Sequence, residues 1–302
     1  KTVLQFCKLA GKQPKFSMGS PKGVFLTNSP FIQYANIEDY GTLSFMATPN
    51  PSFPSVTTVD SVAFKYYNSS GSTISAETVD NIDANGGNTT WNSDTKNQLL
   101  HLGCFPANLQ NWSTVFAAAM SLDLSYYTVR LLDSSNADIS ETITININCP
   151  TLKGFEPIRL TWLNQWGVWD YYTFKMKSTK TISTKGSTYQ QLEGTWNESI
   201  YSPSGYRGGK KAFRVNATEK IKMNTDFVNE AEATWFEELI NSPEVYILDG
   251  FQTDPTTPLL STYVTPARLT TSSFTKKTVA NDKLIQYEFE VEKSKTLRTQ
   301  SV

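Results

Sequence analysis

The chain contains a single histidine, His101, and few of the other groups on which enzymes rely. Histidine is the usual general base, proton shuttle and metal ligand near neutral pH. One copy excludes multi-histidine metal sites, and any histidine-based triad would have to use it. No G-x-S-x-G, P-loop, G-x-G-x-x-G or H-E-x-x-H motif is present. We therefore expect no catalytic site, no metal and no cofactor, and we interpret His101 as a surface or loop residue.

A pair of carboxylates is the hydrolytic arrangement that the composition leaves open. Asp170 and Glu193 lie in the same part of the sequence, beside an aromatic segment. Two carboxyl groups within about 10 Å of each other can hydrolyse a glycoside. Nothing in the sequence brings these two together, and acidic residues on β proteins are usually solvated. Glycoside hydrolysis is therefore a secondary alternative.

Aromatic side chains gather in the segment 162–174, which alternates in the manner of a hairpin around the turn Asn164–Gly167. Exposed Trp166 and Trp169 would form a platform on which a surface glycan could stack. The other interpretation is that the rings fill a sheet core. Both faces of 168–174 are aromatic, so we expect one face to meet the core and the other a neighbouring domain or subunit. This reasoning makes Trp166, Trp169 and Tyr171 interface candidates.

The Gly-rich segment Tyr206–Lys211 has backbone N–H groups and three cations that could hold a phosphate. It lacks the strand–loop–helix context of a phosphate site, and the chain as a whole is not basic. We interpret the segment as an exposed hairpin loop and expect no specific nucleic-acid binding.

Charge is distributed unevenly although the net charge is only −1. Residues 1–26 carry five lysines and no acid, whereas residues 27–150 carry three basic and eleven acidic residues, a net charge of −8. A basic arm before an acidic domain favours docking onto an acidic surface, such as the next copy of the same protein. The alternative is a solvated terminus. This basic N-terminal segment adds Lys8, Lys12 and Lys15 to the interface candidates.

Three cysteines, Cys7, Cys104 and Cys149, fit no zinc motif. A Cys104–Cys149 bridge is possible, and the alternative is buried free thiols in a reducing compartment.

The elements that must position these residues form a mainly β protein of two domains. A length of 302 residues suits two domains, 13% aromatic residues favour strands, and no apolar run is long enough to cross a membrane as a helix. After the basic arm 1–26, residues 27–150 predict strands, a helix over 106–120 and a polar loop over 80–97, in an immunoglobulin-like β-sandwich. The predicted strands are those at 43–48, 62–67, 125–132 and 143–149.

Residues 151–302 predict an α+β domain, a sheet with one covering helix. Strands are expected at 158–162, 168–176, 245–248 and from 281 to 292, the last with alternating apolar and charged residues. A helix is expected from a cap at Thr225 or Asp226 to Asn241, before Pro243. The segment 177–194 is polar, and 202–211 is a Gly-rich loop.

Parts of this second half resemble virion structural proteins of tailed bacteriophages. The resemblance lies in Pro157–Phe174 and in the combination of Met223–Glu230, Leu239–Tyr246 and Thr278–Phe289. The strand–helix–strand order of the combination is similar to the tail-tube-like modules of phage hub and baseplate proteins. The first 150 residues add the immunoglobulin-like pattern that phage decoration and tail proteins share.

The resemblance implies a non-enzymatic structural subunit of the tail, baseplate or neck, located in the virion. Its partners would be other copies of itself and other virion proteins, with no membrane. A β protein rich in Thr, Ser and Asn, with charge-segregated ends, agrees with a self-assembling subunit. The alternative is a glycan-binding adhesin or decoration module that uses Trp166 and Trp169.

Overall fold

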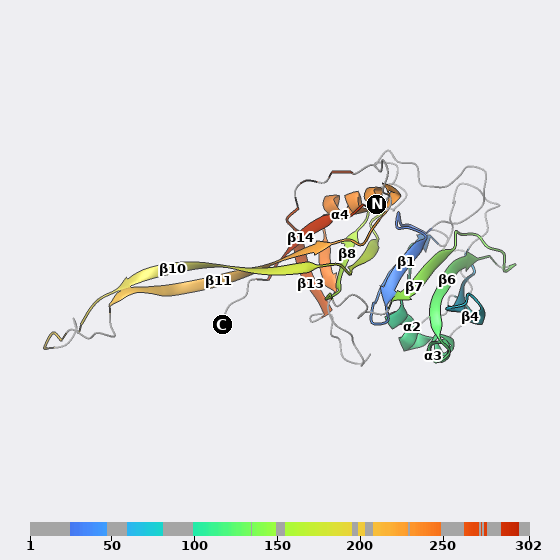
Figure 1. Ribbon diagram of the computed structural model, residues 1–302, viewed down its shortest axis with the longest axis horizontal. Helices are drawn as coiled ribbons and strands as arrows, with labels where there is room; N and C mark the ends of the chain where they lie inside the picture. Colours follow the sequence, from blue (N-terminus) through green and yellow to red (C-terminus); the bar gives the residue numbers. More distant parts are fainter. Residues whose placement is uncertain are drawn as a thin grey trace.

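The protein has a mainly β fold built around two sheets, which the computed structural model places side by side, with a long hairpin projecting from one of them (Figure 1). The first sheet takes its strands from residues 32–148 and the second from residues 158–293. How the chain divides into independently folding domains stays a prediction. The structure describes residues 25–46, 59–80, 99–133, 135–148, 155–194, 199–202, 208–228, 230–248, 263–271, 273, 275–276 and 285–295.

The first sheet has five strands in the order β1-β7-β6-β3-β4. Strand β1 pairs with β7 in parallel, and the other neighbours are antiparallel. The predicted strands at 62–67, 125–132 and 143–149 are confirmed within the described residues, which end at residue 148 in the last strand. In that strand, buried Ile143 and Ile145 alternate with partly exposed polar residues, as in a sheet that buries one face. The bounds are β1 Ile32–Asn36, β3 Ser61–Asn68, β4 Thr73–Asp80, β6 Leu124–Leu132 and β7 Ile143–Asn148.

A small sheet and two helices pack on this sheet around a core that includes Tyr66, Phe116 and Tyr127. They are β2 (Thr42–Met46), β5 (Leu99–Gly103), α2 (Pro106–Trp112) and α3 (Thr114–Met120). An immunoglobulin-like sandwich is not confirmed, because helices take the place of most of a second sheet.

The prediction of a single helix over 106–120 is wrong, because α2 ends before Ser113 and a separate helix, α3, begins after it. The Ser113 hydroxyl accepts a hydrogen bond from the Phe116 backbone N–H at 2.9 Å and so caps α3. The same hydroxyl donates to the Glu77 carboxylate at 2.5 Å. Since Glu77 lies on β4, far away in the sequence, the break depends on a tertiary contact.

The second sheet has seven strands in the order β10-β11-β14-β13-β12-β8-β9. Helix α4 (Glu230–Asn241) covers one face and contributes Trp235 and Phe236 to a core with Trp162 and Phe289. This arrangement is the expected sheet with one covering helix. The strands are β8 Ile158–Leu163, β9 Trp169–Phe174, β10 Ser178–Gln191, β11 Gly209–Asn224, β12 Val245–Leu248, β13 Val264–Leu269 and β14 Glu288–Lys293.

Helix α4 begins later than the predicted cap at Thr225 or Asp226. Thr225 instead donates its backbone N–H to the carbonyl of Tyr287 at 2.9 Å, and Val228 pairs with Ile285. These bonds hold 225–228 in an extended conformation beside the chain that leads into β14, so the helix cannot start there.

The most prominent element is the hairpin of β10 and β11, which contain 14 and 16 residues. The sequence indicates only a polar stretch and a Gly-rich hairpin loop in this region and does not predict these two strands. Only Lys220–Asn224 of β11 pair with β14, so the remainder projects from the sheet as a two-stranded arm (Figure 1). We refer to the paired residues beyond this base, 182–191 and 209–219, as the arm.

Candidate functional site

A buried arginine joins the two sheets. Arg159 on β8 is only 4% exposed, and its guanidinium donates to the Tyr40 carbonyl, from Nη2 at 2.9 Å and from Nε at 3.2 Å. Its Nη1 also donates to the Asp39 carboxylate at 3.1 Å and to the Thr173 hydroxyl at 2.8 Å. Because a buried charge is costly unless it is paired, these bonds lock the two sheets in one relative position.

Aromatic rings complete the surroundings of this guanidinium. Its carbon lies 4.8 Å from the ring centre of Phe105 and 5.2 Å from that of Tyr171, within the range of cation–π attraction. Tyr171 also shares a hydrogen bond with the hydroxyl of Thr42 at 3.1 Å. One face of β9 therefore packs against the first sheet's layer, as expected for a hairpin that is aromatic on both faces.

Asp170, on the opposite face of β9, forms a second buried polar cluster. Its carboxylate accepts hydrogen bonds from the Thr27 hydroxyl at 2.7 Å and from the Trp235 indole N–H at 2.8 Å. Nearby, the Asn164 side-chain amide donates to the Leu26 carbonyl at 2.9 Å. Burial raises the pKa of Asp170 to about 6, although these donors favour the charged form. The segment that leads into β1 is thereby tied to the second sheet.

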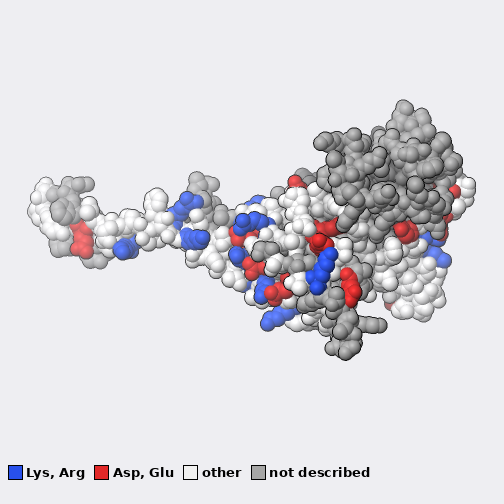
Figure 2. All heavy atoms as spheres, turned by 90° about the horizontal axis from the view of Figure 1, so that it is seen from above, with Lys and Arg blue, Asp and Glu red and all other residues white. Residues whose placement is uncertain are grey.

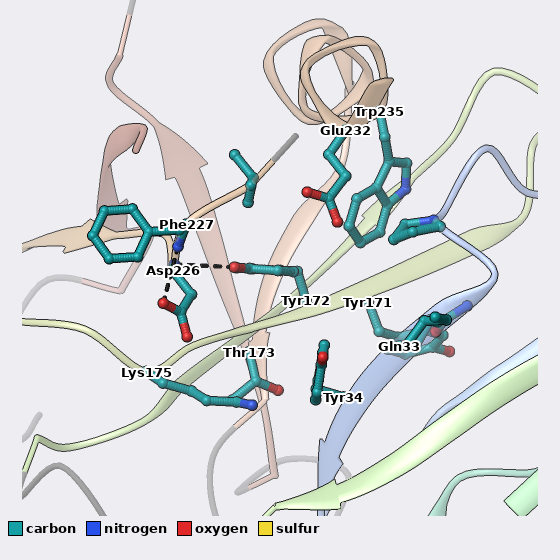
Figure 3. Close-up of a pocket in the computed structure, with 13 residues that line it drawn as sticks. Gln33, Tyr34, Tyr171, Tyr172, Thr173, Lys175, Asp226, Phe227, Glu232 and Trp235 are labelled. Atoms are coloured by element: carbon teal, nitrogen blue, oxygen red, sulfur yellow. Dashed lines mark hydrogen bonds between the residues drawn. The ribbon is translucent and has the colours of Figure 1, made fainter. Parts of the chain in front are cut away.

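The two polar clusters leave a groove between β1 and β9. Each of these strands is at the end of its sheet, so neither has a strand partner on its outer edge within the described chain. The groove has a cavity of about 300 Å³, with the extended segment 226–228 and α4 on its far side. Figure 3 shows the side chains that converge on it.

The groove is lined by aromatic rings and charged groups of both signs. Glu232 comes from α4 on one side of the Tyr172 ring, and Asp226 lies at the hydroxyl end of that ring (Figure 3). The Tyr172 hydroxyl accepts a hydrogen bond from the Asp226 backbone N–H at 3.2 Å, and burial raises the pKa of this tyrosine. Across the groove, Lys175 Nζ lies 4.8 Å from the ring centre of Tyr34. Apolar Ile32 and Phe227 are exposed at the rim.

The arm presents apolar side chains to solvent along its length. Phe213 is 77% exposed, and Ile182, Tyr189 and Val215 are exposed as well. Val215 lies six positions before the core residue Ile221 on β11, so the face of the sheet that α4 covers continues along the arm, where no described element covers it.

The arm is also basic. Its residues 182–191 and 209–219 carry four cations, Lys185, Lys210, Lys211 and Arg214, and one acid, Glu219. Lys and Arg groups recur along the projecting part of the molecule (Figure 2). Within the described residues both strands have an unpaired outer edge over the arm, which makes it a template for pairing with another strand.

The interface candidates from the sequence fall in different places. Trp166 is only 8% exposed and packs with Val168, so the expectation that it is exposed is wrong. Trp169 is partly buried, with its ring 5.6 Å from that of Tyr246, and Tyr171 lies in the junction between the sheets. The lysines Lys8, Lys12 and Lys15 of the basic arm 1–26 lie outside the described residues, as does most of the Gly-rich segment.

The catalytic alternatives are not brought together. Asp170 is buried at the junction, whereas Glu193 is exposed beyond the far end of β10, beside Gly208. His101 is exposed on β5 rather than in a loop, and its Nδ1 shares a hydrogen bond with the Ser44 hydroxyl at 2.7 Å. Cys104 is a free, buried thiol whose pKa is raised to about 12 by burial, and Cys149 lies outside the described residues.

A second cavity, of about 690 Å³, opens on the other side of the junction. It is lined mainly by aromatic rings, those of Tyr40, Trp169, Tyr171, Tyr246 and Tyr263. Its walls also include Asn108 and the buried hydroxyl of Thr161, which has no hydrogen-bond partner. Two residues of this aromatic cavity, Trp169 and Tyr171, are among the interface candidates predicted from the sequence. The groove between β1 and β9 is not predicted, because its walls come from segments far apart in the chain.

No protein-family model matches this chain, and no curated protein matches it. Within the described residues, no three His, Cys, Asp or Glu side chains group in a way that would hold a metal ion. No helix in the described part of the chain is long and apolar enough to cross a membrane.

We expect Arg159→Ala to lower the free energy of unfolding by about 3–5 kcal/mol, because Asp39 is left buried without its cation. Urea unfolding measures the loss. The matched control is Lys180→Ala, which removes an exposed pair with Glu156 at 2.7 Å and should cost under about 1 kcal/mol. Equal losses in the two variants would show that Arg159 does not hold the sheets together.

The pKa of Asp170 predicts a pH dependence. Its value of about 6 in the folded chain exceeds the ordinary 3.8, so the folded state binds the proton more tightly than the unfolded state. Ionisation therefore lowers stability as pH rises from about 4 to above 6, by roughly 3 kcal/mol in total. Asp170→Asn removes this loss while keeping an oxygen acceptor.

Urea unfolding of the parent and of Asp170→Asn at pH 4 and pH 7 tests this expectation. The free energy of unfolding of the variant should rise relative to the parent between the two pH values. A difference that does not change with pH would contradict the burial of an ionisable Asp170 carboxyl.

Proposed function

We propose that this chain is a non-enzymatic structural subunit of a tailed-phage virion, of the tail, baseplate or neck. It assembles with other copies of itself and with other virion proteins. The observation that carries the proposal is the arm of β10 and β11, which extends from the second sheet with its apolar side chains exposed. Assembly would give this surface the cover that the described residues of its own chain do not provide.

The energetics of the arm support this role. An isolated two-stranded hairpin is marginally stable in water, because it buries little apolar surface on either face. Here the exposed side chains include Phe213 and Ile182, and the strand edges are unpaired. In a monomer these apolar side chains face water, whereas contact with a neighbour would bury them and would pair the backbone groups of the strand edges.

The resemblance of Pro157–Phe174, Met223–Glu230, Leu239–Tyr246 and Thr278–Phe289 to phage virion proteins adds the biological setting. The described parts of these segments fall in β8, β9, the end of β11, both ends of α4 and the starts of β12 and β14. The proposed location is therefore the virion, where repeated subunits are the rule. The buried junction around Arg159 would keep the two sheets in a fixed arrangement within such an assembly.

A glycan-binding module is the second candidate, favoured by the aromatic cavity beside Trp169. Aromatic rings with a few hydroxyl and amide groups are the chemistry on which sugar rings stack. Trp166 is buried and cannot take part. In this interpretation Trp169 and Tyr246 replace the predicted pair Trp166 and Trp169.

Removal of the arm should abolish self-assembly. Replacing residues 183–218 by Asn-Gly joins Ile182 to Glu219, which face each other in the register, through a turn that suits two-residue hairpins. We expect a multimer for the parent and a monomer for the variant, measured as native mass by light scattering.

The unfolding midpoint of the shortened chain should match that of the parent, because the removed residues contribute no side chain to the described core. A matched pair of point variants is Phe213→Asp on the arm and Phe155→Asp elsewhere on the surface, and only the first should weaken assembly. A monomeric parent, or a shortened chain that assembles like the parent, would sink the proposal.

The glycan alternative makes a separate prediction. If it holds, Trp169→Ala combined with Tyr246→Ala should reduce binding to a glycan array by at least tenfold, since each lost stacking contact is worth about 1 kcal/mol. The control is Trp112→Ala, an exposed tryptophan on α2 outside the cavity. Absence of glycan binding by the parent, or unchanged binding by the double variant, would exclude this candidate.

A further inference from the structure

We infer that the groove between β1 and β9 is the site that receives the arm of a second copy of this chain, as an added strand. The inference rests on the proposed function and names the surface through which assembly takes place. It follows from the strand edges, the charges and the reach of the arm.

The strand edges give the first argument. Strands β1 and β9 both end their sheets, and their outer edges flank the cavity. An exposed edge binds an extended segment through main-chain hydrogen bonds, and adjacent pockets select its side chains. The arm supplies extended chain with unpaired edges, so donor and acceptor have matching backbone geometry.

The charges give the second argument. Two acids, Asp226 and Glu232, line the groove on the side of α4. The arm carries an excess of the opposite charge, with four cations, Lys185, Lys210, Lys211 and Arg214, and one acid, Glu219. Complementary charges of this kind fix register and suppress wrong partners. Lys175 is a cation at the groove, and it lies over Tyr34 on the side away from α4.

Apolar side chains on the two surfaces match as well. Ile32, Tyr34 and Phe227 are more than half exposed at the groove. Phe213 and Val215 are exposed on the arm, next to the cations Lys211 and Arg214. Docking would bury both sets, which stabilises the contact by roughly 25 cal/mol for each Å² of apolar surface removed from water.

The reach of the arm makes the contact intermolecular. Fourteen residues of extended chain span roughly 45 Å, and the hairpin points away from both sheets (Figure 1). Its outer half therefore cannot fold back onto the groove of its own chain. A second copy is the occupant that the geometry allows.

Site-directed cross-linking tests the contact directly. Tyr34→Cys and Phe213→Cys are made in separate chains that also carry Cys7→Ser and Cys149→Ser, while the buried Cys104 is left in place. Mixing the two chains under mild oxidation should give a disulfide-linked dimer that needs both variants. The control replaces Tyr34→Cys by Phe155→Cys, which is exposed outside the groove and should give no such dimer.

A charge exchange provides the second test. Asp226→Lys with Glu232→Lys should raise the concentration needed for assembly at least tenfold. Adding Lys211→Glu and Arg214→Glu to the same chain should restore most of the loss. The near-ultraviolet circular dichroism of both variants shows whether the fold is kept, and the cross-linking result does not depend on these substitutions.

The outcomes separate this inference from the proposed function. If the shortened arm abolishes assembly but no cross-link forms and the groove variants assemble normally, another surface receives the arm and the inference is overturned alone. If the shortened arm has no effect on assembly, the inference and the proposed function fall together. Specific cross-linking with restoration by the exchanged charges supports both.

Discussion

The bonds of the Arg159 guanidinium are the constraint on which the arrangement of the two sheets depends. The guanidinium lies between the sheets, with the Asp39 carboxylate, the Tyr40 carbonyl and the Thr173 hydroxyl as its acceptors. Asp39 in turn accepts from the Asn36 backbone N–H at 2.8 Å and from Thr173 at 3.0 Å, so its charge is satisfied from both sheets. Because removal of any one partner leaves a buried charge, sliding or opening of the junction is penalised. The distance between β1 and β9, and with it the groove, follows from this lock.

The arm represents the opposite physical situation. Its register is set by backbone pairing from Ser178–Met223 outward, with one irregularity beside Phe213, and no buried core holds it in place. Threonine and serine, which dominate β10, favour extended backbone without requiring burial. The chain therefore combines a body whose internal geometry is fixed by buried polar groups with an extension whose stability depends on what it contacts. This division suits a subunit whose partner contacts form only on assembly.

The sequence predicts best where one face of a strand is buried and the other meets water. Ile143 to Asn148 and Ile285 to Val291 alternate in this way, and both were identified. The pattern fails for β10, which is polar on both faces and shows no apolar period. On β11, Phe213, Val215 and Ile221 do alternate with polar residues, although the first two are exposed. The pattern fails also for Arg159 and Thr161, whose polar face looks solvated in sequence but is buried at the junction. Trp166 and the break at Ser113 depend on tertiary neighbours that no local pattern contains. For the same reason the groove could not be predicted. Its acidic residues and the basic residues of the arm are visible in the sequence, but only the fold shows on which surfaces they lie.

An arm that reaches away from its own body, and a groove that its own arm cannot fill, together restrict the symmetry of assembly. Each copy would give one surface and receive a different one, which is a heterologous contact. Such contacts either close into a ring, when the rotation between copies divides a full turn, or continue as a helical array. In such an assembly the bonds of Arg159 would do more than stabilise the fold. A change in the angle between the two sheets would change the angle at which the arm of the next copy enters the groove. In the proposed assembly a rigid junction would make the rotation per subunit reproducible, which is the property that a closed ring or a regular tube requires.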